Sequence, residues 1–207
     1  MMIRLDELEA RVLGALVEKS LTTPGLYPLT LKGLIAACNQ KTSRDPVMSL
    51  DEATVGRGLH SLIGKSLAGR LHEPGSRVPK FMHHVEFLLD KADAKAVAAV
   101  CVLLLRGPQT PGEIKTRTER LCEFASTAEV ESLLQELAAR PEPWVLQLPR
   151  RPGQKETRYR QLFSGDPSPA APAASVAPLA AATPAPVDRL TLLEKRVEAL
   201  EAIVKGR

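Results

Sequence analysis

Two short turns rich in proline and glycine limit the folds open to this chain. Each turn lies between two strand-like segments, and each of these pairs follows a series of helical patterns. The turns are EPGSR at residues 73–77 and RRPGQKE at residues 150–156. Apolar residues at a spacing of about two flank each turn, which predicts two β-hairpins. The predicted strands are 67–72, 78–85, 144–148 and 157–162.

Three helical patterns precede the first hairpin. An apolar stripe from Leu5 to Leu16 predicts the first helix, and residues 30–39 predict the second. The sequence SLDE predicts the start of a third helix, with Ser49 as its cap and Glu52 completing a capping box. The apolar face of this third helix runs from Val55 to Ile63.

The same order recurs before the second hairpin. Residues 92–105 predict a hydrophobic helix that ends at an Arg-Gly-Pro stop signal. Thr110 and Ser126 each stand three residues before a glutamate, and these pairs predict capping boxes at the starts of two further helices. Three helices followed by a hairpin is the order of a winged helix-turn-helix domain, so two such domains are expected in tandem.

The predicted fold class is mainly α with small β-hairpins (α+β), comprising two tandem winged helix-turn-helix domains plus a C-terminal coiled-coil-like helix. The predicted domains are 1–88 and 89–165, followed by a linker at 166–187 and a helix at 188–206. The linker is rich in alanine and proline, which predicts an extended spacer.

The C-terminal helix carries apolar residues at alternating spacings of three and four, as in the a/d seam of a coiled coil. The seam residues are Leu190, Leu193, Val197, Leu200 and Val204. One interpretation is a homodimer through this seam. The other is a single amphipathic helix that docks on its own domain, because so short a segment is only marginally stable alone.

Composition narrows the class of protein without selecting a function. The formal net charge of +4 is mildly basic and does not by itself indicate nucleic acid. Three widely spaced cysteines argue against a disulfide framework. The longest apolar run, residues 96–105, is too short to span a bilayer, and the N-terminus lacks the apolar core of a signal peptide. We therefore expect a cytoplasmic protein with no membrane association.

The loop CNQKTSRDPV, at residues 38–47, joins the second and third predicted helices and allows two interpretations. Lys41 and Arg44 could contact phosphates at the start of the third helix. Alternatively, the loop is a cap-and-turn network in which Asn39 ends the second helix and Pro46 directs the chain into the third.

The same loop resembles the hallmark of the YceH family, bacterial proteins without an established function. The residues that carry the resemblance are Asn39, Gln40, Lys41, Arg44, Asp45, Pro46 and Val47. The resemblance covers about residues 3–163. It implies tandem winged helices and a C-terminal coiled segment, and it implies no known reaction, ligand or catalytic residue.

The third predicted helix and the second hairpin supply the other basic candidates. The helix is the natural recognition helix, with basic residues on its outward face. The hairpin, RRPGQKETRYR at 150–160, carries five basic residues and one acidic residue. If all five contacted phosphates, log affinity would fall with log salt with a slope of about −4 to −5, whereas the alternative is a solvated hairpin without a ligand. The complete set of candidate DNA contacts is Lys41, Arg44, Arg57, His60, Lys65, Arg150, Arg151, Lys155, Arg158 and Arg160.

These patterns predict a DNA-binding, transcription-regulator-like protein whose partner is double-stranded DNA. The alternative is a protein–protein adaptor built on winged helices, because the third helix of the second domain presents Glu129, Glu131 and Glu136. Such carboxylates would repel phosphates. Cys38 falls on the apolar face of the second predicted helix and is expected to be a core residue. Since the sequence contains no nucleophile–base pair, phosphate loop or metal-ligand spacing, we expect no enzyme activity, no cofactor and no metal site.

Overall fold

The computed structural model describes residues 3–72, 75, 78–150 and 156–164 of the 207-residue chain. All of these residues belong to one compact unit, residues 1–168. The predicted linker at 166–187 and the predicted helix at 188–206 lie outside the described residues. Dimerisation through the seam from Leu190 to Val204 therefore stays a prediction.

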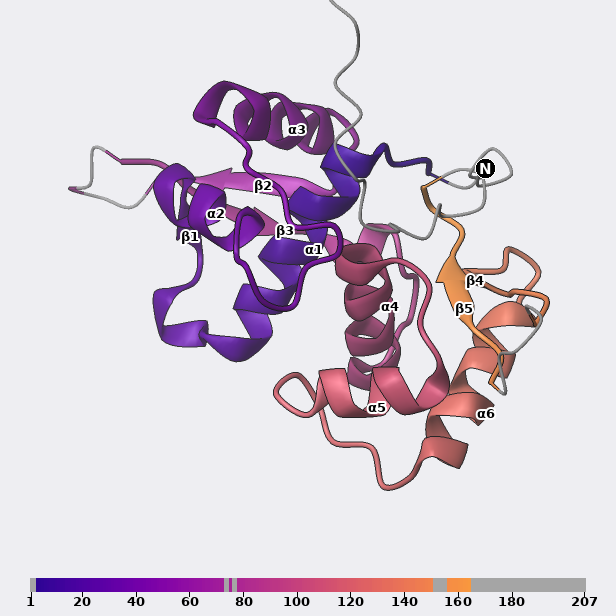
Figure 1. The fold of residues 1–207 in the computed structure, drawn as a ribbon. Helices are drawn as coiled ribbons and strands as arrows, with labels where there is room; N and C mark the ends of the chain where they lie inside the picture. Colours follow the sequence, from indigo (N-terminus) through magenta and orange to yellow (C-terminus); the bar gives the residue numbers. More distant parts are fainter. Residues whose placement is uncertain (1–2, 73–74, 76–77, 151–155, 165–207) are drawn as a thin grey trace, which may run out of the picture. The chain divides into compact units, whose positions relative to one another are not determined.

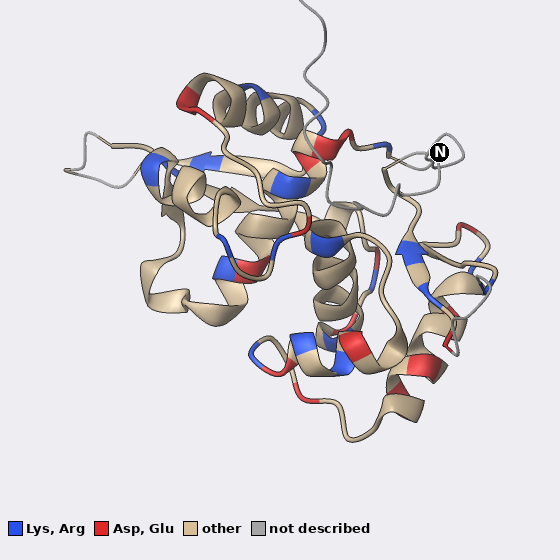
Figure 2. Ribbon diagram, in the orientation of Figure 1, with Lys and Arg blue, Asp and Glu red and all other residues tan. Residues whose placement is uncertain are grey.

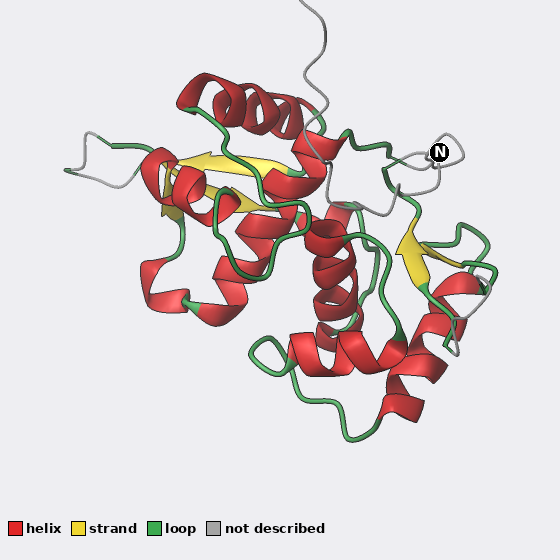
Figure 3. Ribbon diagram, in the orientation of Figure 1, coloured by secondary structure: helices red, strands yellow, loops and turns green. Residues whose placement is uncertain are grey.

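The unit consists of helices and two small antiparallel sheets, which confirms the α+β class (Figures 1 and 3). The first half, residues 3–88, contains α1 (Glu7–Thr22), η1 (Pro24–Leu26), β1 (Leu29–Thr30), α2 (Leu31–Cys38), α3 (Glu52–Gly64), β2 (Ala68–Leu71), β3 (Lys80–His83) and η2 (Val85–Phe87). The second half, residues 89–164, contains α4 (Ala94–Arg106), α5 (Pro111–Thr118), α6 (Thr127–Ala138), β4 (Val145–Gln147) and β5 (Tyr159–Gln161).

In both sheets the last strand of the half pairs with its hairpin partner and with a short segment between the first two helices. In the first sheet the order is β1-β3-β2, with Leu29 opposite Phe81. The second sheet pairs β4 with β5, and an isolated bridge joins Gln109 to Tyr159 of β5. Gln109 lies between α4 and α5, as β1 lies between α1 and α2, and each contacts the last strand of its half. The recurrence of element order thus extends to a short edge pairing that the sequence did not predict.

The helix starts follow the predicted caps in the second half. At Thr110 the capping box is complete, because its hydroxyl accepts from the Glu113 N–H at 3.2 Å and the carboxylate of Glu113 accepts from the Thr110 N–H at 2.9 Å. Ser126 caps α6, but the carboxylate of Glu129 accepts from the Ala125 N–H instead of the Ser126 N–H. A further complete box at Asp6 and Glu9 starts α1, and it was not predicted.

The predicted cap of the third helix is wrong. Asp51, not Ser49, caps α3, and its carboxylate accepts from the Thr54 N–H at 2.7 Å. The reason lies in a contact that is distant in sequence. The side chain of Asn39 holds both the N–H and the carbonyl of Leu50, each at 2.8 Å, so Leu50 cannot enter the first helical turn.

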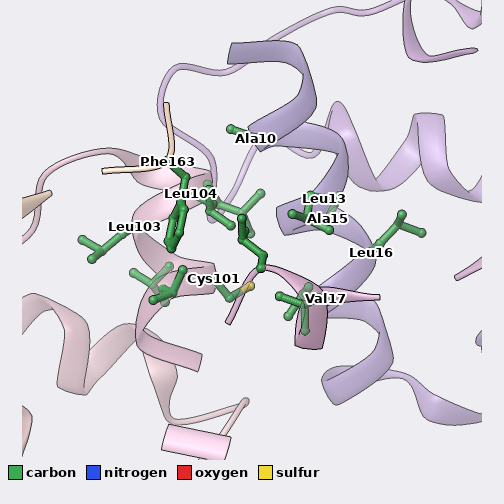
Figure 4. Packing of buried hydrophobic residues seen from close by; sticks show 14 of the residues in the cluster. Ala10, Leu13, Ala15, Leu16, Val17, Cys101, Leu103, Leu104 and Phe163 are labelled. Carbon is green, nitrogen blue, oxygen red and sulfur yellow. The ribbon is translucent and has the colours of Figure 1, made fainter. Parts of the chain in front are cut away.

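A single hydrophobic cluster extends through both halves. Helix α1 packs directly on α4, where the thiol of Cys101 lies 3.4 Å from the carbonyl of Gly14. Figure 4 shows Leu13 of α1 in the same cluster as Leu103 and Phe163 of the second half. The predicted boundary at residue 88 stays a prediction, and both sides of it share this core.

Candidate functional site

The loop at residues 38–47 is held together by the buried guanidinium of Arg44. Its two terminal nitrogens donate to the two carboxylate oxygens of Glu18, at 3.0 and 2.6 Å. The same guanidinium donates to the carbonyls of Ala37 and Ser43 and to the side-chain oxygen of Gln40. The Arg44 side chain has 0% exposed area, so it cannot reach a phosphate. Its assignment as a DNA contact is therefore corrected to a structural role.

Two further side chains brace the same loop. Arg11, buried on α1, donates to the carbonyls of Cys38 and Pro46, at 3.1 and 2.6 Å. Asn39 ends α2 and bonds Leu50, as described above. Arg44, Arg11 and Asn39 together satisfy backbone groups that would otherwise be buried without partners. These contacts support the cap-and-turn interpretation of the loop.

The thiol of Cys38 lies inside this network and is buried. Burial raises the pKa of Cys38 to about 11, although Arg44 and Arg11 act in the opposite direction. A thiol with so high a pKa is almost entirely protonated near neutral pH and is a poor nucleophile. Cys38 is thus a core residue, as predicted.

The outward face of α3 divides into free and engaged side chains. Arg57 and His60 are exposed, and Arg57 donates to the hydroxyl of Thr54 at 3.0 Å. Lys65 instead binds the buried carboxylate of Glu9 at 2.6 Å, and Ser61 donates to the same carboxylate at 2.6 Å. Lys65 thus neutralises Glu9 in the folded chain, and its role as a DNA contact stays a prediction.

The carboxylate of Glu9 makes folding stability depend on pH. Burial by itself raises the pKa of Glu9, but hydrogen bonds from Lys65, from Ser61 and from the Asp6 N–H lower it below its ordinary value. Because the folded pKa is depressed, the stabilisation is complete above the unfolded pKa and is lost as pH falls through the folded pKa.

We expect Glu9→Gln to lower the free energy of unfolding by about 1.5–3 kcal/mol near pH 7, because hydrogen bonds to a charged group are lost. The difference between the variant and the natural chain should shrink as pH falls below about 4.5, where the carboxylate becomes protonated. Urea unfolding across this pH range measures it. A difference that stays constant with pH would contradict the assigned role of the carboxylate.

Of the basic residues that the structure describes in the second hairpin, two are ion-paired or buried within their own half of the chain. Arg158 binds Glu113 at 2.8 Å, and Arg160 is buried. Arg150 is exposed and lies 3.3 Å from the hydroxyl of Thr157. The pairing of Arg158 and the burial of Arg160 leave these two residues less available to a phosphate, and their role as DNA contacts stays a prediction. Arg151 and Lys155 lie outside the described residues.

The third helix of the second half is acidic where it is exposed. Glu131 and Glu136 are exposed on α6, while Glu129 is paired with Lys95 of α4. Figure 2 shows the acidic positions of α6 as red segments. Two of the three predicted carboxylates are therefore exposed, and their repulsion of a phosphate backbone stays a prediction.

Four predicted DNA contacts remain exposed in the described part of the chain: Lys41, Arg57, His60 and Arg150. Arg70, on the outer strand of the first sheet, is also exposed. The sequence missed the anionic partners Glu9, Glu18 and Glu113. A glutamate next to an apolar stripe carries no signal for the distant arginine or lysine that it will bind.

None of the helices in the described part of the chain has the length and hydrophobicity that a membrane span requires.

Known proteins with similar sequences were found over most of the chain. Residues 5–154 match the family described as "Protein of unknown function, DUF480". A UPF0502 protein of Aeromonas hydrophila is 45% identical over 96% of this chain and 92% of its own length. A UPF0502 protein of Opitutus terrae is 51% identical over 95% of this chain and 83% of its own. The corresponding values for one of Geotalea daltonii are 51%, 82% and 77%.

Proposed function

This chain belongs to the DUF480 family of proteins of unknown function, as its resemblance to YceH predicted, and from that premise we propose that it binds duplex DNA through its first half. The second half packs against the first half and stabilises it, and it does not enter a groove of the DNA. This division of work differs from the sequence-based expectation, in which the second hairpin supplied most of the charge.

The order of elements supports an assignment of each half as a winged helix. The first half has the order α1-β1-α2-α3-β2-β3, and the second has α4, the Gln109 bridge, α5, α6, β4 and β5. In a winged helix the third helix is the recognition helix and the hairpin is the wing. On this assignment α3 faces the major groove, and β2 and β3 form the wing of the first half.

The observation that carries the proposal is the free basic face of α3. Val55, Leu59 and Leu62 are buried against the core, which leaves Arg57 and His60 exposed on the other side. Arg70 on β2 and Lys41 before α3 add two further exposed cations to the first half. Arg57 and His60 can approach base edges or phosphates, while Lys41 and Arg70 are suited to phosphates.

Binding to a mixed-sequence duplex at several salt concentrations tests the proposal. If Lys41, Arg57 and Arg70 each neutralise one phosphate, log affinity should fall with log salt with a slope of about −3. Arg57→Ala should reduce that slope by about one and weaken binding about tenfold. Fluorescence anisotropy with a labelled duplex measures both quantities.

The matched control is Glu131→Gln on α6, which changes a charge on the helix that is not expected to touch DNA. It should leave the slope unchanged. Absence of salt-sensitive binding by the natural chain would remove the DNA proposal. Equal effects of Arg57→Ala and Glu131→Gln would remove the assignment of α3.

A protein–protein adaptor is the second candidate, and the exposed apolar surface favours it. Phe87 is 63% exposed and Leu26 is 75% exposed, in addition to the acidic face of α6. A partner captured from native lysate that survives nuclease treatment, and is lost with Phe87→Ala, would support this function. Loss of all captured protein on nuclease treatment would argue for DNA.

A further inference from the structure

A cationic cleft lies where the two halves meet. Its walls come from the C-terminal part of α1, the loop at residues 40–43, the end of α4, and α5 with the turn that follows it. The cleft has a volume of about 150 Å³. That is smaller than the roughly 300–1,000 Å³ of pockets for drug-sized ligands, and it suits a small ion or one polar group.

The charges that line the cleft are unbalanced. Four cationic side chains line it: Lys19, Arg106, Arg117 and Arg120. Glu18 is the acidic residue in the lining, and both of its carboxylate oxygens already accept hydrogen bonds from the buried Arg44. Glu18 is therefore shared among Arg44, Lys19 at 3.7 Å and the cleft, so one carboxylate faces four cations there.

The four cations of the cleft have few carboxylate partners in the part of the chain that the structure describes. Among the described residues, neither Arg106 nor Arg120 has an ion-pair partner within 4.0 Å. Arg117 lies 3.6 Å from Glu113, but that glutamate also binds Arg158 at 2.8 Å. Lys19 is 3.7 Å from Glu18. Figure 2 shows the basic segments of α5 and of the turn after it.

The excess of positive charge in the cleft also affects Arg106. Arg106 is half-buried at the end of α4. Burial lowers the pKa of Arg106, and repulsion by Arg117 and Arg44 lowers it further, while Asp45 and Glu18 act in the opposite direction without cancelling the effect. A bound anion would relieve this repulsion, because an opposite charge stabilises the protonated form.

Hydrogen bonds hold the loop that forms one side of the cleft. The Asp45 N–H donates to the carbonyl of Leu105 at 3.0 Å and so fixes the loop to α4. Arg44 holds the same loop to α1. The arginines on the other sides of the cleft present planar forks that match the oxygens of a phosphate group.

We propose that this cleft binds a small phosphate-bearing anion, with Arg106, Arg117 and Arg120 as its ligands and Lys19 as an additional cation. The ligand is of the inorganic phosphate, diphosphate or small phosphorylated-metabolite class. Its charged group lies between α1 of the first half and α5 of the second, so binding links the two halves. The proposal does not depend on DNA binding.

The test uses the full chain with sodium diphosphate as the probe, and sodium chloride at equal ionic strength as the reference. We expect diphosphate to raise the Tm in a saturable manner, because a ligand that binds the folded state stabilises it. By isothermal titration, Arg120→Gln and Arg106→Gln should each weaken diphosphate binding about tenfold, since each removes charged hydrogen bonds. Lys32→Gln, which removes one exposed cation of α2 that does not line the cleft, should leave diphosphate binding unaltered.

The outcomes separate the possible sources of the anion. A rise in Tm that chloride reproduces, or that all three variants share equally, would overturn the proposal. Diphosphate without effect, together with weaker duplex binding by Arg120→Gln, would show instead that the cleft contacts nucleic-acid phosphates, and this also overturns it. Because Arg120 is exposed, Arg120→Gln tests the cleft even if Arg106→Gln fails to fold.

Discussion

Replacement of Arg44 by alanine is expected to lower the free energy of unfolding by about 3–5 kcal/mol, the cost of removing one partner from a buried ion pair. Glu18, whose side chain is only 12% exposed, would lose both of its hydrogen bonds from the guanidinium. The carbonyl of Ala37 would also lose two donors. A buried acceptor without a donor bears its full desolvation cost.

Urea unfolding followed by circular dichroism measures this loss. Arg57→Ala is the matched control, because it removes the same side chain from an exposed position of α3 and should change stability by less than about 0.5 kcal/mol. Arg44→Lys should restore only part of the stability, since an ammonium group cannot bind both oxygens of Glu18 as a planar fork. A loss below about 1 kcal/mol for Arg44→Ala would mean that the network is not needed to hold the loop.

Replacement of Gly14 by valine is expected to lower the free energy of unfolding by about 1–3 kcal/mol or more, because the added carbons overfill a packed core. A Cβ atom at Gly14 would lie 2.9 Å from Cγ and Cδ2 of Leu105, and 3.3 Å from Cβ of Leu104. Both leucines are buried on α4, so neither can move aside freely. Gly14 thus permits the close contact of α1 and α4 that joins the two halves.

Gly56→Val is the control for this second prediction. Gly56 also lies inside a helix, but a Cβ atom there would meet nothing within 4 Å. The change in helix propensity is therefore the same at both positions, and the difference between the two variants isolates the clash. Thermal unfolding of Gly14→Val should remain a single transition if both halves share one core. Two separate transitions in the natural chain would contradict the shared core.

Local sequence patterns were reliable where local chemistry decides the structure. Thr110 and Ser126 cap their helices as predicted. A cap needs only backbone N–H groups a few residues away, so it does not depend on contacts that are distant in sequence. The predicted strands on either side of the two turns are also present, as β2 with β3 and β4 with β5, although they are shorter than predicted. Apolar stripes at helical spacing likewise identified most of the buried residues of α1 and α3, although Ile63, predicted on the buried face of α3, is 36% exposed.

Predictions failed where a distant residue competes for the same group. Ser49 lost the capping position because Asn39 holds Leu50, eleven residues away. Basic residues were assigned to DNA because a charge in a sequence shows no partner. Arg44, Lys65 and Arg158 each found a carboxylate on another helix, at Glu18, Glu9 and Glu113.

The sequence by itself determined the class of fold, the recurrence of helices and hairpins, and the family, because these depend on periodicity and on short motifs. Only the tertiary structure decided which basic residues stay free and which neutralise a buried carboxylate. It also brought four cations from three helices and a turn to one cleft. Electrostatic partners are chosen by distance in space, and that distance is set when α1, α4 and α5 pack together.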